Sequence, residues 1–214
     1  MRLVMPRLYV ILDAGLVREP AQEIARQLVE AGVRLLQYRA KNVAARETLG
    51  TAKQLADLAR KEGANFFVND RPDLAYLSGA DGVHVGQDDL SVEQARTILG
   101  PDRWVGVSTH NRQQFERAVA SSADYVAIGP IFATTSKLNP DPVVGIELLR
   151  QLRPLTQKPI VAIGGIRLDR AAEVIEAGAD SVAVISDILG APNPAQKARQ
   201  FIQRLEAAKP AAHD

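Results

Sequence analysis

Eight short apolar runs alternate with amphipathic helical patterns from one end of the chain to the other. The runs are rich in β-branched and aromatic residues, and the patterns between them repeat apolar residues at helical spacing. Strands joined through helices pair in parallel, because a parallel pair needs a long crossover connection. The predicted strands cover residues 8–12, 35–38, 66–68, 83–85, 104–107, 125–128, 160–163 and 181–185. The helical patterns cover residues 21–31, 46–62, 92–99, 113–120, 147–152, 170–177 and 194–208.

The number of repeats indicates the architecture. Eight strands in 214 residues fit a single-domain (β/α)8 barrel, the TIM-barrel fold, and 46% hydrophobic residues suffice for one large core. We expect the barrel over residues 1–208 and a disordered tail over residues 209–214. A flavodoxin-like or Rossmann sheet is the alternative. It usually has fewer strands at this length, and no G-x-G-x-x-G motif follows the first strand.

A short internal repeat marks the junctions between helical patterns and strands. It reads Gly-Ala-Asp or Ser-Ala-Asp at residues 79–81, 122–124 and 178–180, each time directly before an apolar run. Glycine can adopt the left-handed conformation that ends a helix, and the small alanine lets the chain turn into the next strand. The repeat therefore marks structural units rather than an activity.

The charge balance restricts the partners of the chain. Lys and Arg total 26 against 25 for Asp and Glu, so we expect neither nucleic acid nor an anionic membrane as a partner. No apolar run approaches the roughly 18 residues of a membrane span, and residues 1–6 are too short for a signal sequence. The lack of cysteine excludes disulfides, thiolate nucleophiles and cysteine metal sites. We expect a soluble cytoplasmic protein that binds any anion with local groups.

Polar residues follow nearly every predicted strand, and in a (β/α)8 barrel these positions meet at one mouth. Gln37, Arg39 and Lys41 share one side of an extended segment, because side chains alternate along a strand. Three polar groups on one inward face predict a polar ligand, although a strand end that frays into solvent gives the same pattern. Asn69 and Ser108 follow the third and fifth runs and would face the same mouth.

The segment 129–137 predicts an anion site. It reads Gly-Pro-Ile-Phe-Ala-Thr-Thr-Ser-Lys, and its hydroxyl groups and terminal lysine offer the hydrogen bonds and the point charge that a phosphate or diphosphate needs. Residues 164–165 follow the seventh run and residues 185–186 lie at the end of the eighth, where barrels often bind phosphate through backbone N–H groups. Glycines that merely permit a tight turn at residues 164–165 are the alternative.

Two aspartates predict a metal site. Asp70 and Asp88 come from separate strand ends and could hold one Mg²⁺, with waters and ligand oxygens completing its octahedron. Each acid taken singly is more typical of a helix cap or a turn, as is the neighbouring Asp89. His84 lies inside a strand and is interpreted as a core residue, whereas His110 follows a strand and is interpreted as a loop residue, with proton transfer as the alternative.

Taken together, these motifs resemble those of the thiamine-phosphate synthase family. The resemblance runs from about Tyr9 to Phe201. It rests on Gln37-x-Arg39-x-Lys41, on Asn69-Asp70-Arg71, and on the segments at residues 82–90, 107–110, 129–137 and 162–166. It implies a barrel that joins hydroxymethylpyrimidine diphosphate to hydroxyethylthiazole phosphate, with one Mg²⁺, and releases thiamine phosphate and diphosphate.

The resemblance also implies roles for individual residues. Asp70 and Asp88 would hold the metal, and Arg39, Lys41 and Lys137 would be catalytic. The pyrimidine diphosphate site would comprise Gln37, Tyr38, Arg39, Ala40, Lys41, Asn69, Ser108 and Lys137. The thiazole phosphate site would comprise Thr134, Thr135, Ser136, Gly165, Ile185 and Ser186. The departures from the family pattern are Tyr38 and Ala40 in place of a commoner leucine and acidic residue, Ala133 in place of a frequent proline, and the less usual Asp187.

Two rivals follow from the same family. A thiazole tautomerase would need a positioned base, for which His110 is the candidate, and a regulatory module would hold thiazole phosphate without reacting it. The joint presence of the predicted cations and metal ligands argues against both. A dissociative substitution needs no acid/base pair, because the thiazole nitrogen carries no proton to remove. The sequence leaves a homodimer open.

Overall fold

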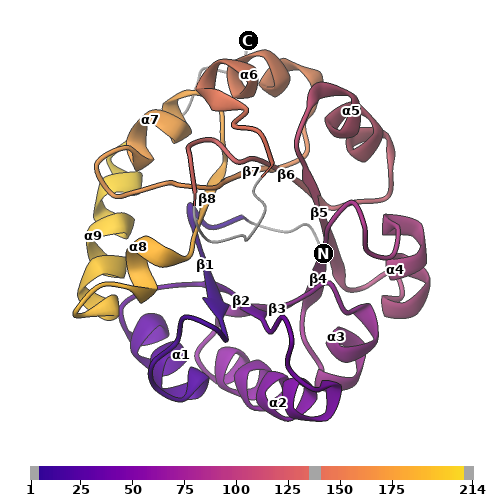
Figure 1. The fold of residues 1–214 in the computed structure, drawn as a ribbon, viewed down its shortest axis with the longest axis vertical. Helices are drawn as coiled ribbons and strands as arrows, with labels where there is room; N and C mark the ends of the chain where they lie inside the picture. Colours follow the sequence, from indigo (N-terminus) through magenta and orange to yellow (C-terminus); the bar gives the residue numbers. More distant parts are fainter. Residues whose placement is uncertain (1–4, 135–140, 210–214) are drawn as a thin grey trace.

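Eight parallel strands close into a barrel in sequence order in a computed structural model that describes residues 5–134 and 141–209 (Figure 1). Each strand pairs with its neighbours in sequence, and β1 pairs with β8. The (β/α)8 prediction is confirmed. The strands are β1 (Leu8–Asp13), β2 (Leu35–Arg39), β3 (Asn65–Asn69), β4 (Gly82–Val85), β5 (Trp104–Thr109), β6 (Tyr125–Ile128), β7 (Ile160–Ile163) and β8 (Ser181–Val184).

The helices form a ring around the barrel (Figure 1). All seven helical patterns are confirmed within a few residues, and two short helices, α3 and α8, were not predicted. The α-helices are α1 (Ala21–Glu30), α2 (Ala45–Lys61), α3 (Pro72–Ser78), α4 (Val92–Leu99), α5 (Arg112–Ala120), α6 (Gly145–Leu152), α7 (Ala171–Glu176), α8 (Ser186–Leu189) and α9 (Pro194–Glu206). A short 3₁₀ turn, Arg153–Leu155, follows α6.

Side chains of the strands alternate between two apolar layers, as the pleat requires. Outward-facing residues such as Leu12 and Phe66 pack under the helices in the larger cluster. Inward-facing aromatic rings fill the barrel, and Gly106 makes room for one of them, because a Cβ there would lie 2.0 Å from the Tyr125 ring. The inner cluster comprises Tyr9, Ile11, Leu35, Phe67, Tyr125, Ala127, Val161 and Ala183. This packed interior closes the barrel below the mouth.

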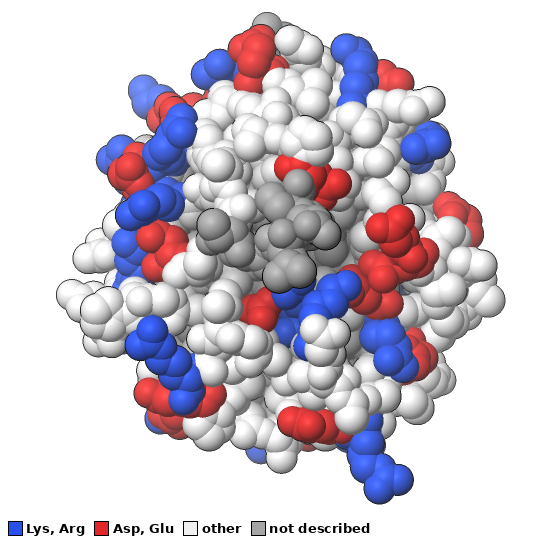
Figure 2. Space-filling view, viewed as in Figure 1, with Lys and Arg blue, Asp and Glu red and all other residues white. Residues whose placement is uncertain are grey.

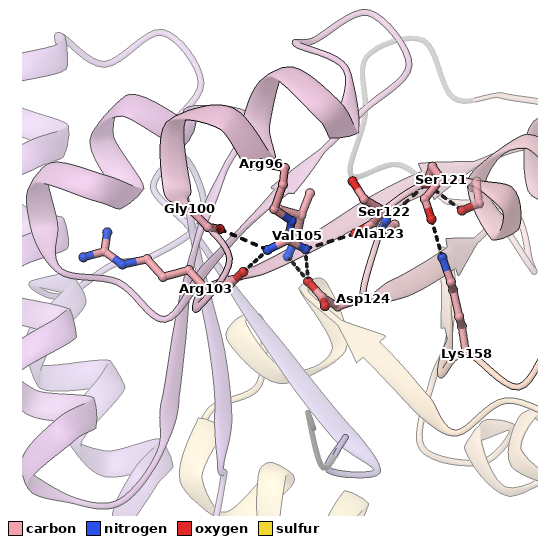
Figure 3. A network of polar contacts seen from close by, with 10 residues as sticks. Arg96, Gly100, Arg103, Val105, Ser121, Ser122, Ala123, Asp124 and Lys158 are labelled. Atoms are coloured by element: carbon pink, nitrogen blue, oxygen red, sulfur yellow. Dashed lines mark hydrogen bonds and ion pairs between the residues drawn. The ribbon is translucent and has the colours of Figure 1, made fainter. Parts of the chain in front are cut away.

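The aspartates of the internal repeat join neighbouring strands where the strands begin. Asp81, Asp124 and Asp180 each accept a hydrogen bond from a backbone N–H group of the preceding strand. Arg96 lies 2.5 Å from Asp124 (Figure 3), and Arg153 lies 2.7 Å from Asp180. The repeat is therefore structural, as predicted. The donors are Phe66, Val105 and Ile160, at 2.8, 2.7 and 2.7 Å respectively.

Candidate active site

A pocket opens at the carboxyl ends of the strands, where the barrel architecture places the loops that follow them. Acidic and basic side chains lie side by side near the centre of the face in Figure 2, over the part of the barrel where β2, β3 and β4 lie in Figure 1. Eight of the predicted site residues line this one pocket. They are Gln37, Arg39, Asn69, Ser108, Thr134, Gly165, Ile185 and Ser186.

Arg39 is oriented by a carboxylate that the sequence analysis did not single out. The register of β1 and β2 places Asp13 opposite Arg39, and the two side chains form an ion pair that is largely buried. The other carboxylate oxygen of Asp13 accepts a hydrogen bond from the Gly15 N–H group at 2.9 Å. Asp13 thus holds the guanidinium at the pocket wall. In the sequence, Asp13 directly follows the first apolar run, just as Arg39 directly follows the second.

Lys41 and two aspartates form a charged cluster at the rim. Lys41 lies beyond the end of β2, and its Nζ is 2.5 Å from Oδ2 of Asp70. Asp70 has a φ of +63°, a left-handed conformation that aspartate tolerates better than most residues, and its N–H group donates to the His84 carbonyl at 2.7 Å. Its carboxylate is in hydrogen-bond contact with that of Asp89.

Asp89 rather than Asp88 faces Asp70. A carboxylate oxygen of Asp89 accepts from the Gly86 N–H group at 2.7 Å, which turns the side chain back toward the strand end. Burial, and then the neighbouring Asp70, raise the pKa of Asp89. Asp88 is exposed, and its side chain makes no hydrogen bond or ion pair with the other residues that the structure describes. The sequence analysis therefore missed Asp89 as a partner of Asp70.

The two crowded carboxylates fit a divalent cation. Acids in contact need a proton or a cation between them, and oxygen ligands suit Mg²⁺. Within residues 5–134 and 141–209 no group of three or more acidic or histidine side chains could hold a metal. Waters and oxygens of a bound diphosphate would have to complete the coordination of an ion at Asp70 and Asp89.

Tyr38 and Ala40 face away from the pocket, as the alternation along β2 requires. Tyr38 is buried in the outer layer, where burial raises the pKa of its hydroxyl and Thr51 hydrogen-bonds to it. Ala40 packs against the same outer cluster. Because these two side chains face away, only the backbone groups of Tyr38 and Ala40 can contact a ligand in the pocket.

His84 and His110 both reach the pocket. His110 lies with Nδ1 2.6 Å from the Gly129 carbonyl and Nε2 3.5 Å from a carboxylate oxygen of Asp141. Because Nδ1 must donate to the carbonyl, Nε2 of the neutral ring is an acceptor. His84 is 8% exposed, as expected of a core residue, yet it also lines the pocket and contacts Ser108.

The wall opposite β2 and β3 is built from glycine and hydroxyl residues. Gly164 and Gly165 have φ values of +96° and +63°, and a Cβ at Gly165 would lie 2.3 Å from the Ala133 carbonyl oxygen. Backbone contact with the loop after β6 thus requires glycine here. Ile185 lies just past β8, one residue before α8 begins at Ser186. Thr135, Ser136 and Lys137 lie outside the described residues.

The barrel and its mouth have clear relatives. Residues 8–188 match the family model described as thiamine monophosphate synthase. The chain belongs to the thiamine monophosphate synthase family. A thiamine-phosphate synthase of Koribacter versatilis is 52% identical over 210 residues, which cover 96% of this chain and 98% of the relative. One of Chloroflexus aurantiacus is 44% identical over 196 residues, covering 91% and 90% of the two chains.

A solved structure agrees with these sequence relatives. Thiamine phosphate pyrophosphorylase from Pyrococcus furiosus is 35% identical and superposes with a TM-score of 0.86, covering 94% of this chain and 96% of its own. Membership of the thiamine monophosphate synthase family makes the chain a transferase of thiamine biosynthesis, as the resemblance implied. Within the described part of the chain, no helix is long and apolar enough to cross a membrane.

Proposed function

We propose that the chain joins hydroxymethylpyrimidine diphosphate to hydroxyethylthiazole phosphate and releases thiamine phosphate and diphosphate. The observation that carries this proposal is that one pocket has two chemically different walls. Gln37, Arg39 and Asn69 form a polar and cationic wall next to the charged cluster of Lys41, Asp70 and Asp89. The other wall holds Thr134, Gly165 and Ser186, which suit a smaller phosphate. Two anionic substrates can therefore meet within one cavity.

The barrier in this reaction is charge separation. As the bond from the pyrimidine methylene to the diphosphate oxygen breaks, negative charge grows on the diphosphate, and Arg39, Lys41 and Lys137 stabilise it. The amino group of the pyrimidine delocalises the opposing positive charge on the ring. The thiazole nitrogen then forms the new carbon–nitrogen bond with its lone pair, so no base has to remove a proton. Gln37 and Ser108 orient the pyrimidine toward that nitrogen.

Asp70 and Asp89 would hold Mg²⁺ at the edge of the same wall. When bound, the ion neutralises charge on the leaving diphosphate. The ammonium of Lys41, which pairs with Asp70 in this structure, lies within reach of the same anion. Asp13 keeps the Arg39 guanidinium at the pocket wall, so that less side-chain entropy is lost when the diphosphate binds.

One assay tests the proposal against its rivals. Purified protein is incubated with both substrates and Mg²⁺, with and without a chelator, and thiamine phosphate is measured. We expect product that depends on both substrates and on the metal. Conversion of a thiazole tautomer without pyrimidine would support a tautomerase, and binding of thiazole phosphate without turnover would support a regulator.

The cellular setting is part of the same proposal. The substrates and product are small phosphorylated molecules, and we propose that the enzyme meets them in the cytoplasm, without nucleic acid or membrane as a partner. We also propose a homodimer, which light scattering of the purified protein tests directly.

A further inference from the structure

A continuous chain of hydrogen bonds runs through the barrel beneath the pocket. Gln37 Nε2 lies 2.6 Å from the Tyr9 hydroxyl, which lies 3.3 Å from the Tyr125 hydroxyl. The Tyr125 hydroxyl lies 2.9 Å from Nδ1 of His84, whose Nε2 lies 2.8 Å from Oγ of Ser108. These five side chains, the buried relay, come from β2, β1, β6, β4 and β5 in that order.

The relay has pocket residues at its ends and buried phenols at its centre. Gln37, His84 and Ser108 line the pocket, whereas Tyr9 and Tyr125 are 1% and 0% exposed within the inner apolar layer. Burial raises the pKa of Tyr9 and of Tyr125 above that of an ordinary phenol. Each hydroxyl therefore keeps its single proton near neutral pH and has one hydrogen bond to donate.

With a neutral His84, every hydroxyl along the relay can both donate and accept in two arrangements of opposite direction. With the Gln37 amide nitrogen toward Tyr9, as the structure has it, Tyr9 donates to Tyr125 and Tyr125 donates to Nδ1 of His84. Nε2 of a neutral His84 then carries the proton and donates to Ser108, whose own hydroxyl hydrogen is left to donate elsewhere. In the opposite direction every donor and acceptor is exchanged, which turns the Gln37 amide over and makes Ser108 the donor to His84.

We propose that the buried relay couples the side chains of Gln37 and Ser108, so that the group which one presents to the pocket, donor or acceptor, fixes the group which the other presents. Tyr9, Tyr125 and His84 are the positioning residues. Gln37 then offers its amide oxygen to the pocket as an acceptor, and Ser108 offers its hydroxyl as a donor. This arrangement suits a heterocycle with an amino group at Gln37 and an unprotonated ring nitrogen at Ser108. It rejects the ring in which an oxo group replaces the amino group, because two acceptors would then face each other.

The inference rests on the proposed function for its ligand, since a 4-aminopyrimidine has an amino donor and ring-nitrogen acceptors. It goes further by assigning the choice of amino over oxo pyrimidine to Tyr9 and Tyr125, which lie in the inner apolar layer behind the pocket lining. Breaking the relay at Tyr9 or Tyr125 removes the restraint on the Gln37 amide, which can then turn over. The oxo analogue should gain acceptance relative to the amino substrate, because Gln37 can now present its nitrogen.

The test compares Tyr9→Phe, Tyr125→Phe and the double variant with the wild-type protein. The control is Tyr76→Phe on α3, which removes the hydroxyl of a tyrosine that is 53% exposed and outside the pocket. For each protein the KM of the amino substrate and the inhibition constant of its 4-oxo diphosphate analogue are measured, and thermal unfolding confirms the fold.

We expect the wild-type protein and the control to prefer the amino compound by on the order of a hundredfold or more. Each relay variant should lower this ratio by about tenfold, an effect worth roughly 1.4 kcal/mol. The double variant should lose no more than the more sensitive single variant, because one break already interrupts the relay. Mere loosening of the barrel would weaken both ligands together and leave the ratio unchanged.

Three results would overturn the proposed coupling of Gln37 to Ser108. They are an unchanged ratio in both single variants, a preference of the wild-type protein for the oxo analogue, and a loss in Tyr76→Phe equal to that in the relay variants. Failure of the proposed function is a separate outcome, because the wild-type protein would then form no thiamine phosphate from the amino substrate at all.

Discussion

The ammonium group of Lys41 lies 2.5 Å from a carboxylate oxygen of Asp70, although Lys41 stands beyond the end of β2 and 53% of its side chain is exposed. Asp70 is also in contact with Asp89. The ammonium therefore balances part of the charge of an acid pair that is suited to a divalent cation. An ion bound there would compete with Lys41 for Asp70 and leave the ammonium available to a diphosphate.

The contact between Asp70 and Asp89 predicts that Asp89, rather than its neighbour Asp88, is needed for metal binding. Asp89→Asn should lower turnover about a hundredfold or more and raise the Mg²⁺ concentration needed for half-maximal rate, because it removes a charged oxygen from the pair. Asp88→Asn, at an exposed position one residue earlier, serves as the matched control and should change turnover less than about threefold. Mg²⁺ titrations of thiamine phosphate formation give both values. A larger loss in Asp88→Asn than in Asp89→Asn would restore the assignment made from sequence.

Lys137 is predicted to act on the departing diphosphate. Lys137→Ala should reduce the single-turnover rate by on the order of 10² to 10³, because one charged donor to the developing anion is lost. We expect the variant to retain the fold, with an unfolding temperature within a few degrees of the wild-type value. Rapid-quench measurement of thiamine phosphate formation tests this. A single-turnover rate equal to that of the wild-type protein would refute the role.

The fold could be predicted because each strand is a distinct apolar run and most helices are long enough to show their period. The helix α3 is absent from the predicted helical patterns, because Pro72–Ser78 has only seven residues and its N-cap residue, Arg71, offers no side-chain cap. In α8 there are only four residues, Ser186–Leu189, too few for any helical pattern. Ile185 was assigned to the last strand because it continues an apolar run, whereas the strand ends at Val184.

The site could be predicted only where strand geometry controls it. Alternation along β2 correctly placed Gln37 and Arg39 at the pocket, and the same alternation turns Tyr38 outward. It could not choose between Asp88 and Asp89, because the hydrogen bond from Gly86 that turns Asp89 inward forms in a loop where no period applies. The contact between Arg39 and Asp13 depends on the register of two strands, which no local pattern encodes.

The aspartate of the second repeat is predicted to stabilise the barrel. Asp124→Asn weakens the contact with Arg96 at 2.5 Å, an ion pair that is largely shielded from solvent, and should lower the free energy of unfolding by about 1 to 3 kcal/mol. Asp57→Asn is the control, because Asp57 pairs with Arg60 on the surface of α2 with more than half of both side chains exposed, and it should cost less than about 1 kcal/mol. Urea unfolding at neutral pH measures both, and equal losses would contradict the prediction.

The equivalent aspartate of the first repeat should behave differently with pH. Burial raises the pKa of Asp81 even though the Phe66 N–H group, Arg60 and Arg103 lower it. An acid whose pKa rises on folding contributes stability below its unfolded pKa, near 3.9, and that contribution is lost as the pH rises through the folded value. Asp81→Asn does not titrate and can still accept from Phe66. Relative to the wild-type protein, the variant should therefore gain stability between about pH 4 and pH 7. A stability difference that is constant over this range would show that the carboxyl does not titrate as stated.

Gly165 allows a test of the thiazole phosphate wall in which backbone conformation is controlled. Both Gly165 and Gly63 have left-handed φ values, +63° and +66°, so alanine at either position should cost about 1 to 2 kcal/mol of stability. Only at Gly165 would the new Cβ meet other atoms, the Ala133 carbonyl oxygen at 2.3 Å and the Phe132 carbonyl oxygen at 2.8 Å.

Gly165→Ala should therefore displace the loop after β6 and raise the KM of thiazole phosphate at least about tenfold, equivalent to roughly 1.4 kcal/mol of binding. Gly63→Ala should share the loss of stability and keep the wild-type KM, because nothing lies within 4 Å of its Cβ. Steady-state kinetics at a saturating concentration of the pyrimidine substrate separate the two effects. If Gly165→Ala retains the wild-type KM while losing as much stability as Gly63→Ala, the glycine serves the turn alone and the phosphate must bind elsewhere.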